Sequence, residues 1–371
     1  MTQISLPPSP TSSIDWDSLG FKWIDTNGHV KYIFQDGQWD QGEFVRDSYI
    51  KMHVCAPALN YGQECFEGIK AFRCKDGQVR IFRPDANARR MRYSAELACM
   101  APVPEDLFVE ACERAVANNL EFVPPYGSGG ALYLRPLLLG TGPEIGLYPA
   151  PEFTFIVMVI PVGNFYKGGV SPVDCLVVET FDRAAPLGTG AAKLGGNYAP
   201  VLKHSSEAKA RGYPITLHLD SKTHTNVDEF STSNFVALTA PSSSSTSEDA
   251  QPTFCAPESP SILNSVTKQS LVQLAKSFGW QVENRVIPFT EVTDNRFQEI
   301  AACGTAAVIT PVKSIERGGV KTMIGDAKTQ AAIGPGFLRL FTAMRGIQNG
   351  DLEDPYGWMQ PAQGIAVRHE A

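Results

Sequence analysis

The sequence has little that would place the protein in a membrane, on a nucleic acid or around a metal. No apolar run approaches the roughly 20 residues that a membrane-spanning helix needs, and the best one, 153–161, suits a buried strand. Asp and Glu (39) outnumber Lys and Arg (32), and the formal charge of −7 argues against non-specific binding of nucleic acid or anionic membrane. The six histidines are not spaced as ligands and the eight cysteines include no Cys-x-x-Cys pair, so we expect no metal site.

The first residues also lack the features of a targeting segment. They are rich in Ser and Pro and have neither an apolar core nor an early Arg or Lys, unlike a secretory signal or a transit peptide. Cysteines scattered singly in a chain of this size fit a reducing compartment. We therefore predict a cytoplasmic protein, with a mitochondrial location left open.

The length of 371 residues and the hydrophobic content of 43% predict two domains with well-developed cores. A Gly-rich connector at 163–172 separates the expected smaller N-terminal domain (1–162) from a larger C-terminal domain (173–371). Within the latter, the Ser- and Pro-rich segment 240–260 is expected to form a surface insertion. Alternating strand-like and helical segments, without an internal repeat, favour mixed α/β or α+β domains. The expected strands are 69–73, 79–83, 132–138, 153–162, 175–179, 215–219, 281–287 and 306–312, and the expected helices are 84–100, 104–120, 198–210, 267–278 and 337–347.

The most informative segment is 183–198, in which small residues surround a single lysine, Lys193. Gly and Ala leave room for a bound group and allow the backbone to approach it closely. A lysine in such surroundings can form a Schiff base with an aldehyde when its pKa is lowered. The alternative is a surface lysine in a flexible loop, which is the commoner case for an arbitrary glycine-flanked lysine. Arg183 upstream, with Asn197 and Tyr198 at an expected helix start, favours the first interpretation.

Three further segments each have a simpler structural explanation when taken alone. Glu229 is either an acid in a turn or a carboxylate for a protonated ring nitrogen, as a pyridoxal cofactor requires. The helix start at Val266 and Thr267 is either an ordinary N-terminus or a cradle for a phosphate. Small residues at 303–307 form either a tight turn or a source of N–H groups for a phosphate or carboxylate. Together with Lys193, these segments indicate a site for pyridoxal 5'-phosphate (PLP).

Five ordered motifs resemble those of branched-chain amino acid aminotransferases, which belong to the fold-type IV group of PLP enzymes. The motifs lie at 59–72, 82–91, 132–136, 188–198 and 304–312, and include the sequences YGQECFEGIKAF and GTGAAKLGGNY. The resemblance extends over most of the chain and is closer to the eukaryotic members than to the short bacterial ones. It implies a two-domain fold similar to that of D-amino acid aminotransferase, a PLP cofactor, and a homodimer with the active site near the subunit interface.

The resemblance also implies roles for individual residues. Lys193 would hold PLP as an internal aldimine and then act as the base that moves the proton, and Glu229 would pair with the pyridine nitrogen. Tyr198 would hydrogen-bond the phenolic oxygen, and Thr232 would contact the ring. The residues implied for the phosphate are Arg90, Arg183, Val266, Thr267 and Thr305. Those implied for the substrate are Tyr61, Phe66, Tyr133, Arg135, Thr305 and Ala306.

Within that substrate set, the resemblance assigns the second carboxylate of glutamate to Arg135 and the α-carboxylate to the N–H groups of Thr305 and Ala306. Tyr61 lies in a loop that the family shares across the dimer interface. The chain departs from the family pattern at Asn60, where many relatives have His, at Asn264-Ser265 in place of Pro-Gly, and at Lys268 in place of Arg. These departures leave the shape of the phosphate loop and the substrate range open.

The implied reaction transfers an amino group between a branched-chain L-amino acid (Leu, Ile or Val) and 2-oxoglutarate, both small molecules. One alternative is a fold-type IV enzyme with another substrate: a D-amino acid, an (R)-amine, aminodeoxychorismate or an unusual amino acid of secondary metabolism. Another is a PLP-binding homologue without turnover, against which the presence of both Lys193 and Glu229 counts.

Overall fold

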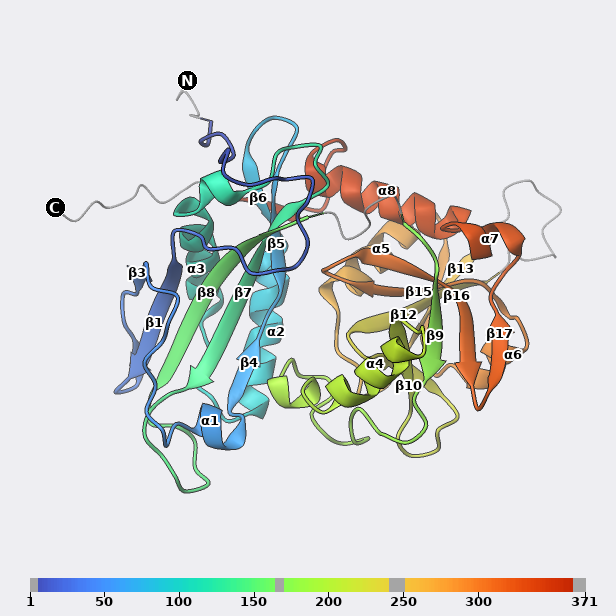
Figure 1. Cartoon of the computed structure of the whole chain (residues 1–371), viewed down its shortest axis with the longest axis horizontal. Helices are drawn as coiled ribbons and strands as arrows, with labels where there is room; N and C mark the ends of the chain where they lie inside the picture. The colour runs from blue at the N-terminus through green and yellow to red at the C-terminus, as the bar shows by residue number, and fades with distance from the viewer. Residues whose placement is uncertain (1–5, 164–169, 240–250, 363–371) are drawn as a thin grey trace. The chain divides into compact units, whose positions relative to one another are not determined.

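The computed structural model describes residues 6–163, 170–239 and 251–362, and its elements divide into two compact units (Figure 1). Unit 1 comprises Met1–Phe165, Ala192–Gly195 and Gly346–Ala371, and unit 2 comprises Tyr166–Ala191 and Gly196–Arg345. Each unit has its own sheet and its own helices, which confirms the predicted mixed class. The short segment Ala192–Gly195 groups with unit 1 although its neighbours in sequence on both sides belong to unit 2.

The sheet of unit 1 is antiparallel throughout its described strands. The strand order is β18-β6-β5-β7-β8-β1-β2, with β3 paired to β1 and β4 paired to β7. Its centre is a long hairpin in which every residue of β7 pairs with one of β8, from Ala131 opposite Val162 to Gly140 opposite Phe153. The strands are β1 (His29–Gln35), β2 (Gln38–Trp39), β3 (Glu43–Val45), β4 (Glu64–Phe66), β5 (Ile69–Arg73), β6 (Val79–Phe82), β7 (Ala131–Gly140), β8 (Phe153–Val162) and β18 (Met359–Pro361).

Two helices cover one face of this sheet, α2 (Pro84–Leu97) and α3 (Glu105–Ala117). Helix α2 begins with Pro84 and Asp85, which suit the first turn because Pro lacks an N–H and Asp favours the positive end of the helix dipole. Apolar residues of both helices pack on Leu132, Leu134 and Leu138 of β7 in one core. Successive strand residues point to opposite faces, so Tyr133 and Arg135 lie on the face away from this core. The remaining short elements are α1 (Pro57–Tyr61) and η1 (Leu120–Phe122).

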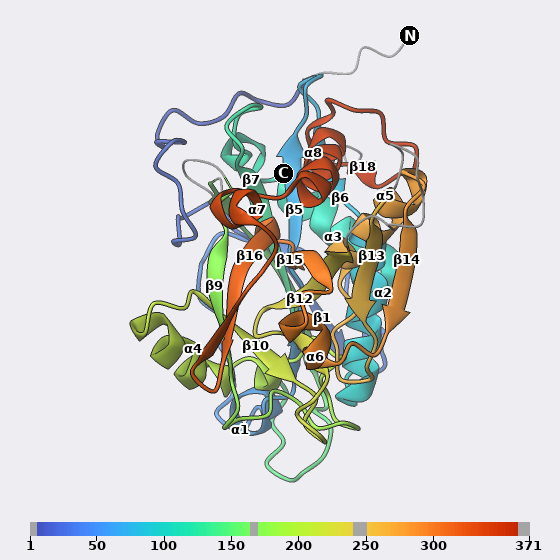
Figure 2. The same ribbon diagram turned by 90° about the vertical axis from the view of Figure 1, so that its right-hand side faces the viewer.

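The sheet of unit 2 is mixed and has the order β11-β10-β9-β16-β15-β12-β13-β14, with β17 paired to β16. An additional pairing of β11 with β12 closes part of the sheet on itself. Helix α4 packs on β10 and α5 on β14 and β15, and Figure 2 shows β13 beside its parallel partner β14. The strands are β9 (Val173–Val177), β10 (Ile215–Leu219), β11 (Val227–Phe230), β12 (Ser233–Thr239), β13 (Thr253–Pro257), β14 (Gln281–Arg285), β15 (Phe297–Gly304), β16 (Val308–Arg317) and β17 (Val320–Met323). The helices of this part of the chain are η2 (Gly195–Asn197), α4 (Val201–Ala210), α5 (Val266–Ser277), α6 (Phe289–Thr293), α7 (Ala327–Ala331) and α8 (Pro335–Asn349).

The prediction that residues 240–260 form a surface insertion is wrong for residues 253–257. Residues 253–257 form the strand β13, with Phe254, Cys255 and Ala256 fully buried between β12 and β14. The serines and prolines around this strand obscured its short apolar run. Residues 240–250 of that prediction, and 164–169 of the predicted connector, lie outside the described residues.

Within the described ranges, no helix combines the length and apolar character needed to cross a bilayer. In the same ranges, no group of three or more His, Cys, Asp or Glu side chains could hold a metal ion.

Candidate active site

In unit 1, the main chain of Lys193 is held by hydrogen bonds on both of its polar groups. Its N–H donates to Oγ of Ser94 at 2.9 Å, and its carbonyl accepts from the N–H of Phe66 at 3.1 Å. The next residue, Leu194, forms an antiparallel bridge with Cys65. The lysine segment therefore lies along β4 like a short added strand, which fixes where its side chain starts.

The amine of Lys193 lies over an aromatic ring in a buried, charged environment. Its Nζ is 4.5 Å from the ring centroid of Phe66. Burial, followed by the positive charge of Arg90, lowers the pKa of Lys193 to about 8, while Glu67 and Tyr133 act in the opposite direction. Near pH 8, about half of the Lys193 side chains are therefore neutral and able to act as a nucleophile or a base.

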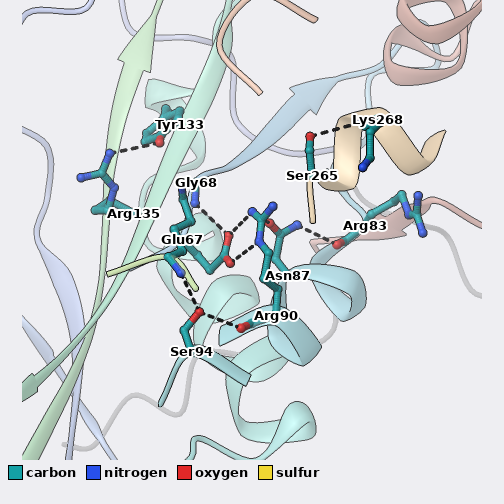
Figure 3. A network of polar contacts seen from close by, with 11 residues as sticks. Glu67, Gly68, Arg83, Asn87, Arg90, Ser94, Tyr133, Arg135, Ser265 and Lys268 are labelled. Atoms are coloured by element: carbon teal, nitrogen blue, oxygen red, sulfur yellow. Dashed lines mark hydrogen bonds and ion pairs between the residues drawn. The ribbon is translucent and has the colours of Figure 1, made fainter. Parts of the chain in front are cut away.

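Glu67 and Arg90 form an ion pair (Figure 3), and the charges of both act on Lys193. Arg90 donates from Nε to Oε1 of Glu67 at 2.7 Å and from Nη2 to Oε2 at 2.6 Å, and it also donates to Oδ1 of Asn87. Glu67 is fully buried, and an unpaired buried carboxylate would be costly. The two hydrogen bonds from Arg90 offset this cost. The spacing of Asn87, Arg90 and Ser94 places all three on one side of α2. The sequence interpretation missed Glu67 and Ser94, although Glu67 is part of the quoted 59–72 motif.

Three of the predicted substrate residues form a wall on the face of the unit 1 sheet opposite the core with α2 and α3. Phe66 of β4 pairs with Leu137 of β7, so its ring shares a face with Tyr133 and Arg135. The Arg135 guanidinium lies 4.8 Å from the Phe66 ring centroid and donates to the Tyr133 hydroxyl at 3.1 Å. The Tyr133 hydroxyl also lies against Gly68, where a Cβ atom would collide with it. Nε of Arg135 is buried and has no hydrogen-bond partner in the described part of the chain.

Tyr61 is placed elsewhere in unit 1. It ends α1, is 49% exposed, and donates from its hydroxyl to the Ile145 carbonyl at 2.5 Å. Asn60, one of the departures from the family pattern, donates its amide to the carbonyls of Val54 and Ala56. Asn60 thus ties α1 to the loop before it, while a function of Tyr61 toward substrate stays a prediction.

In unit 2, Glu229 is held in the hairpin of β11 and β12. It lies directly opposite Asn234, whose amide donates to Oε2 at 2.5 Å. Oε1 accepts from the Leu263 N–H at 3.1 Å and lies 2.7 Å from Nη2 of Arg183. Burial raises the pKa of Glu229 to about 6, and the nearby Arg183 cation limits that rise. The carboxylate is therefore ionised at pH 7 even though it is buried.

The surroundings of Glu229 fit a protonated ring nitrogen. An ionised carboxylate offers about four acceptor sites, and the three donors leave one on Oε2. Beside it, Oδ1 of Asn234 is buried and has no hydrogen-bond partner among the described residues. The donor and acceptor set of this hairpin is thus compatible with the pyridine end of PLP.

The start of α5 presents free N–H groups. Ser265 is the N-cap, and its Oγ accepts from the Lys268 N–H at 3.2 Å (Figure 3). The main-chain ladder begins with Gln269 N–H donating to the Ser265 carbonyl. Within the described ranges, the N–H groups of Val266 and Thr267 have no protein acceptor, so with the helix dipole they suit a phosphate. Serine in place of the family glycine therefore still caps this helix.

The remaining predicted residues of unit 2 lie in turns. Thr305 and Ala306 connect β15 to β16 and are followed by Val308, which has φ +66°. This left-handed conformation is strained for a β-branched residue and costs about 1–3 kcal/mol, as often occurs at binding sites. Thr232 is exposed at the turn between β11 and β12, and Tyr198 lies in the turn that leads into α4.

Two of the departures from the family pattern line one cavity. Asn264 and Lys268, together with Glu258, Ser259 and Asn284, line a pocket of about 420 Å³ in unit 2. The substitutions at 264 and 268 therefore change the same local surface, immediately beside the start of α5.

Comparison with known proteins decides the family. Residues 64–315 match the sequence profile of the family described as Amino-transferase class IV. The chain belongs to the class IV aminotransferases. Transaminase AMT5 of Alternaria alternata is 44% identical over 366 residues, which cover 98% of this chain and 96% of that one. Branched-chain amino acid aminotransferase gloG of Glarea lozoyensis is 43% identical over 359 residues, covering 96% of this chain and 98% of that one.

Solved structures agree with this assignment. This class IV aminotransferase is similar to the branched-chain amino acid aminotransferase of Escherichia coli, with a TM-score of 0.73, 27% identity, and coverage of 90% of this chain and 100% of that chain. The resemblance drawn from the motifs and the predicted fold-type IV architecture are thereby confirmed. The protein is an aminotransferase, and its family implies PLP as the cofactor. The names of its relatives differ in specificity, so the substrate is taken up below as a proposal.

Proposed function

We propose that this class IV aminotransferase exchanges the amino group between a branched-chain L-amino acid and 2-oxoglutarate, within branched-chain amino acid metabolism. The observation that carries the proposal is the wall beside the Lys193 amine, where the Phe66 ring lies against Arg135. The ring offers apolar surface for Leu, Ile or Val. The buried Nε of Arg135, which has no partner in the described ranges, offers a donor for the second carboxylate of glutamate.

The residues that the family resemblance assigns to the cofactor keep these assignments as proposals. PLP, when bound, supplies an electron sink that stabilises negative charge at the substrate Cα. Glu229 would hold the ring nitrogen protonated, Tyr198 and Thr232 would contact the ring, and the Val266 and Thr267 N–H groups would bind the phosphate. Arg90, Arg183 and Thr305 remain proposed phosphate ligands, and the two arginines pair with Glu67 and Glu229 in the structure.

Lys193 would then act as the base of the reaction. Its lowered pKa of about 8 lets the amine take a proton from the substrate Cα and return it, because the neutral and protonated forms are both populated near neutral pH. The hydrogen bonds to Ser94 and Phe66 hold the main chain of Lys193 and so fix the position from which its side chain extends. The α-carboxylate would be bound by the Thr305 and Ala306 N–H groups.

A second candidate is a transaminase specialised for another amino acid. It is favoured by relatives such as Transaminase AMT5 and the Aminotransferase poxL of Penicillium oxalicum, both 44% identical, whose names state no branched-chain substrate. The Haemophilus influenzae relative, 43% identical over 93% of this chain, is called a branched-chain-amino-acid aminotransferase and favours the first candidate. Asn264 and Lys268, which depart from the family pattern and line one pocket, support an altered phosphate loop and with it a different substrate range.

A spectroscopic titration separates the proposed specificity from specificity for a D-amino acid or an (R)-amine. The PLP-loaded protein is mixed with L-leucine, L-glutamate, a D-amino acid or an (R)-amine, and the absorbance of the bound cofactor is followed. The proposal expects L-leucine and L-glutamate to change the spectrum and the other two to leave it unchanged. A response to the D-amino acid or the (R)-amine would support the alternative specificity, and a spectrum unchanged by any amine would indicate binding without turnover.

We also propose a homodimer, because two linked segments of unit 1 expose many apolar side chains. The segments are 49–61, which includes α1, and 145–148, and hydrogen bonds from Tyr61 to Ile145 and from Glu144 to Cys55 join them. Exposed apolar side chains that gather in one region often mark a protein interface. The group consists of Tyr49, Ile50, Val54, Leu59, Tyr61, Ile145, Leu147 and Tyr148, of which Leu147 is 84% exposed.

A further inference from the structure

An acid lies on the same face of the unit 1 sheet as the proposed substrate wall. Glu64 pairs with Leu139 of β7, and Phe66 pairs with Leu137, so both side chains of β4 point to one side. Arg135 is two residues before Leu137 on β7 and shares that side. The wall proposed for an apolar side chain therefore carries one carboxylate as well as one guanidinium.

Arg135 and Glu64 interact without forming a direct ion pair. Arg135 has no carboxylate within 4 Å among the described residues, and its guanidinium lies on Phe66 and Tyr133 instead. The charge of Arg135 nevertheless acts on Glu64: burial raises the pKa of Glu64, and the hydrogen bond from the Gly195 N–H and then the charge of Arg135 oppose that rise. The acid is thus close enough to offset part of the positive charge that Arg135 presents to a substrate.

The position of Glu64 is fixed by the segment that carries Lys193. The Gly195 N–H donates to the Glu64 carboxylate, and a Cβ atom at residue 195 would collide with Oε1. Glu64 therefore packs directly against the backbone two residues after Lys193. It cannot turn away from the wall without breaking this contact, so the carboxyl group stays beside the wall.

We propose that Glu64 is a specificity-determining residue, whose carboxylate offsets the charge of Arg135 and so favours substrates with uncharged side chains over substrates with a second carboxylate. The inference rests on the proposed function, which places the substrate side chain on this wall. It predicts that the pocket favours amino acids with uncharged side chains. It also predicts that a dicarboxylate binds more weakly than it would if Arg135 acted without Glu64.

The test is a neutral variant that keeps the contact with Gly195. Glu64→Gln retains an oxygen that accepts from the Gly195 N–H and removes the charge. Two unreactive acids are titrated into PLP-loaded protein: glutarate, with two carboxylates, and 4-methylpentanoate, with one. The Kd for glutarate should fall about tenfold, or about 1.4 kcal/mol, whereas the Kd for 4-methylpentanoate should change less than about twofold.

Controls keep the result specific to this acid. Glu96→Gln removes a surface acid that pairs with Arg92 and should leave the ratio of the two Kd values unchanged. Glu64→Ser provides a second neutral variant in case the glutamine variant does not fold, and it should shift the ratio in the same direction.

The outcomes distinguish this inference from the function on which it rests. An unchanged ratio in Glu64→Gln or Glu64→Ser, with normal binding of 4-methylpentanoate, would overturn the inference alone. Failure of the wild-type protein to bind either acid would overturn the proposed function and the inference with it.

Discussion

At the scale of single residues, the environment of Lys193 lowers the pKa of its amine, which suits the proposed functions of nucleophile and base. The amine is buried on Phe66, and Arg90 adds a positive charge that disfavours protonation. Replacement by Lys193→Ala should lower transamination by about 10²–10⁴-fold or more, because it removes both the nucleophile and the base. Some PLP should still bind through the phosphate contacts.

Steady-state kinetics with L-leucine and 2-oxoglutarate measure this loss. The matched control is Lys203→Ala, an exposed lysine on α4, which should retain full activity. Comparable activity in the Lys193 and Lys203 variants would remove Lys193 from the mechanism.

The lowered pKa of Lys193 also predicts how uptake of an aldehyde depends on pH. Only the neutral amine reacts, so the rate at which PLP-free protein captures PLP should rise with pH up to about 8 and then level off. Below that value the rate should fall about tenfold for each pH unit. Stopped-flow absorbance measures this profile, and a rate that keeps rising toward pH 10 would mean that the amine has the pKa of an ordinary exposed lysine.

Arg135 should matter more for one substrate than for the other. Arg135→Leu removes the guanidinium that the proposal assigns to the second carboxylate of glutamate. We expect kcat/KM for 2-oxoglutarate to fall about 10²-fold, since a charge-assisted hydrogen bond contributes about 1.5–3 kcal/mol, and kcat/KM for leucine to change only a few-fold. Equal losses for the two substrates would show that Arg135 has a structural function instead.

At the scale of elements, two adjacent glycines after Lys193 have opposite surroundings. A Cβ at Gly195 would collide with Glu64, whereas a Cβ at Gly196 would meet nothing within 4 Å, and neither glycine has a positive φ. Gly195→Ala should therefore displace the lysine segment from β4 or move Glu64, at a cost of about 1–3 kcal/mol in stability together with loss of activity.

Gly196→Ala is the matched control and should stay within about 1 kcal/mol of the wild type with full activity. Thermal unfolding and leucine kinetics on both variants test the contrast. Equal behaviour of the two variants would contradict the packing of Glu64 against residue 195.

The same scale shows which elements could be predicted from sequence. The strands β5, β8 and β10 begin and end at the predicted residues, because each is rich in apolar and β-branched residues and is followed by turn-forming residues. The strands β4 and β13 were missed because they are only three and five residues long and stand among polar or turn-forming residues. The missed β4 matters most, because it carries Glu64 and Phe66 and holds the lysine segment.

At the scale of the whole molecule, the motifs identified the family and most candidate residues, but pairings between distant segments were beyond sequence reasoning. Arg183 was predicted at the phosphate, and the structure places its guanidinium beside Glu229. The pairing of Glu67 with Arg90, 23 residues apart, likewise follows from the fold and not from spacing. Charge partners of this kind depend on which strands and helices pack together, which a single sequence does not reveal.

The proposed dimer gives a prediction at this scale. Leu147→Glu places a charge in the exposed apolar group of unit 1. Because burying this charge in an interface is costly, the variant should be monomeric and less active. Val320→Glu is the control, because Val320 is 70% exposed on β17 in unit 2, outside that group. Sedimentation velocity should report monomers for the first variant only, and a wild-type protein that is monomeric would contradict the proposal.

The central claim, that Lys193 is the residue that bonds to the cofactor, is tested most directly by covalent trapping. The PLP-loaded protein is reduced with borohydride, digested, and mapped by mass spectrometry, with and without prior addition of L-leucine. The account predicts a pyridoxyl group on Lys193, and a marked decrease of that label when leucine is added first. A label on other lysines only, or no label on a protein that retains bound PLP, would contradict it.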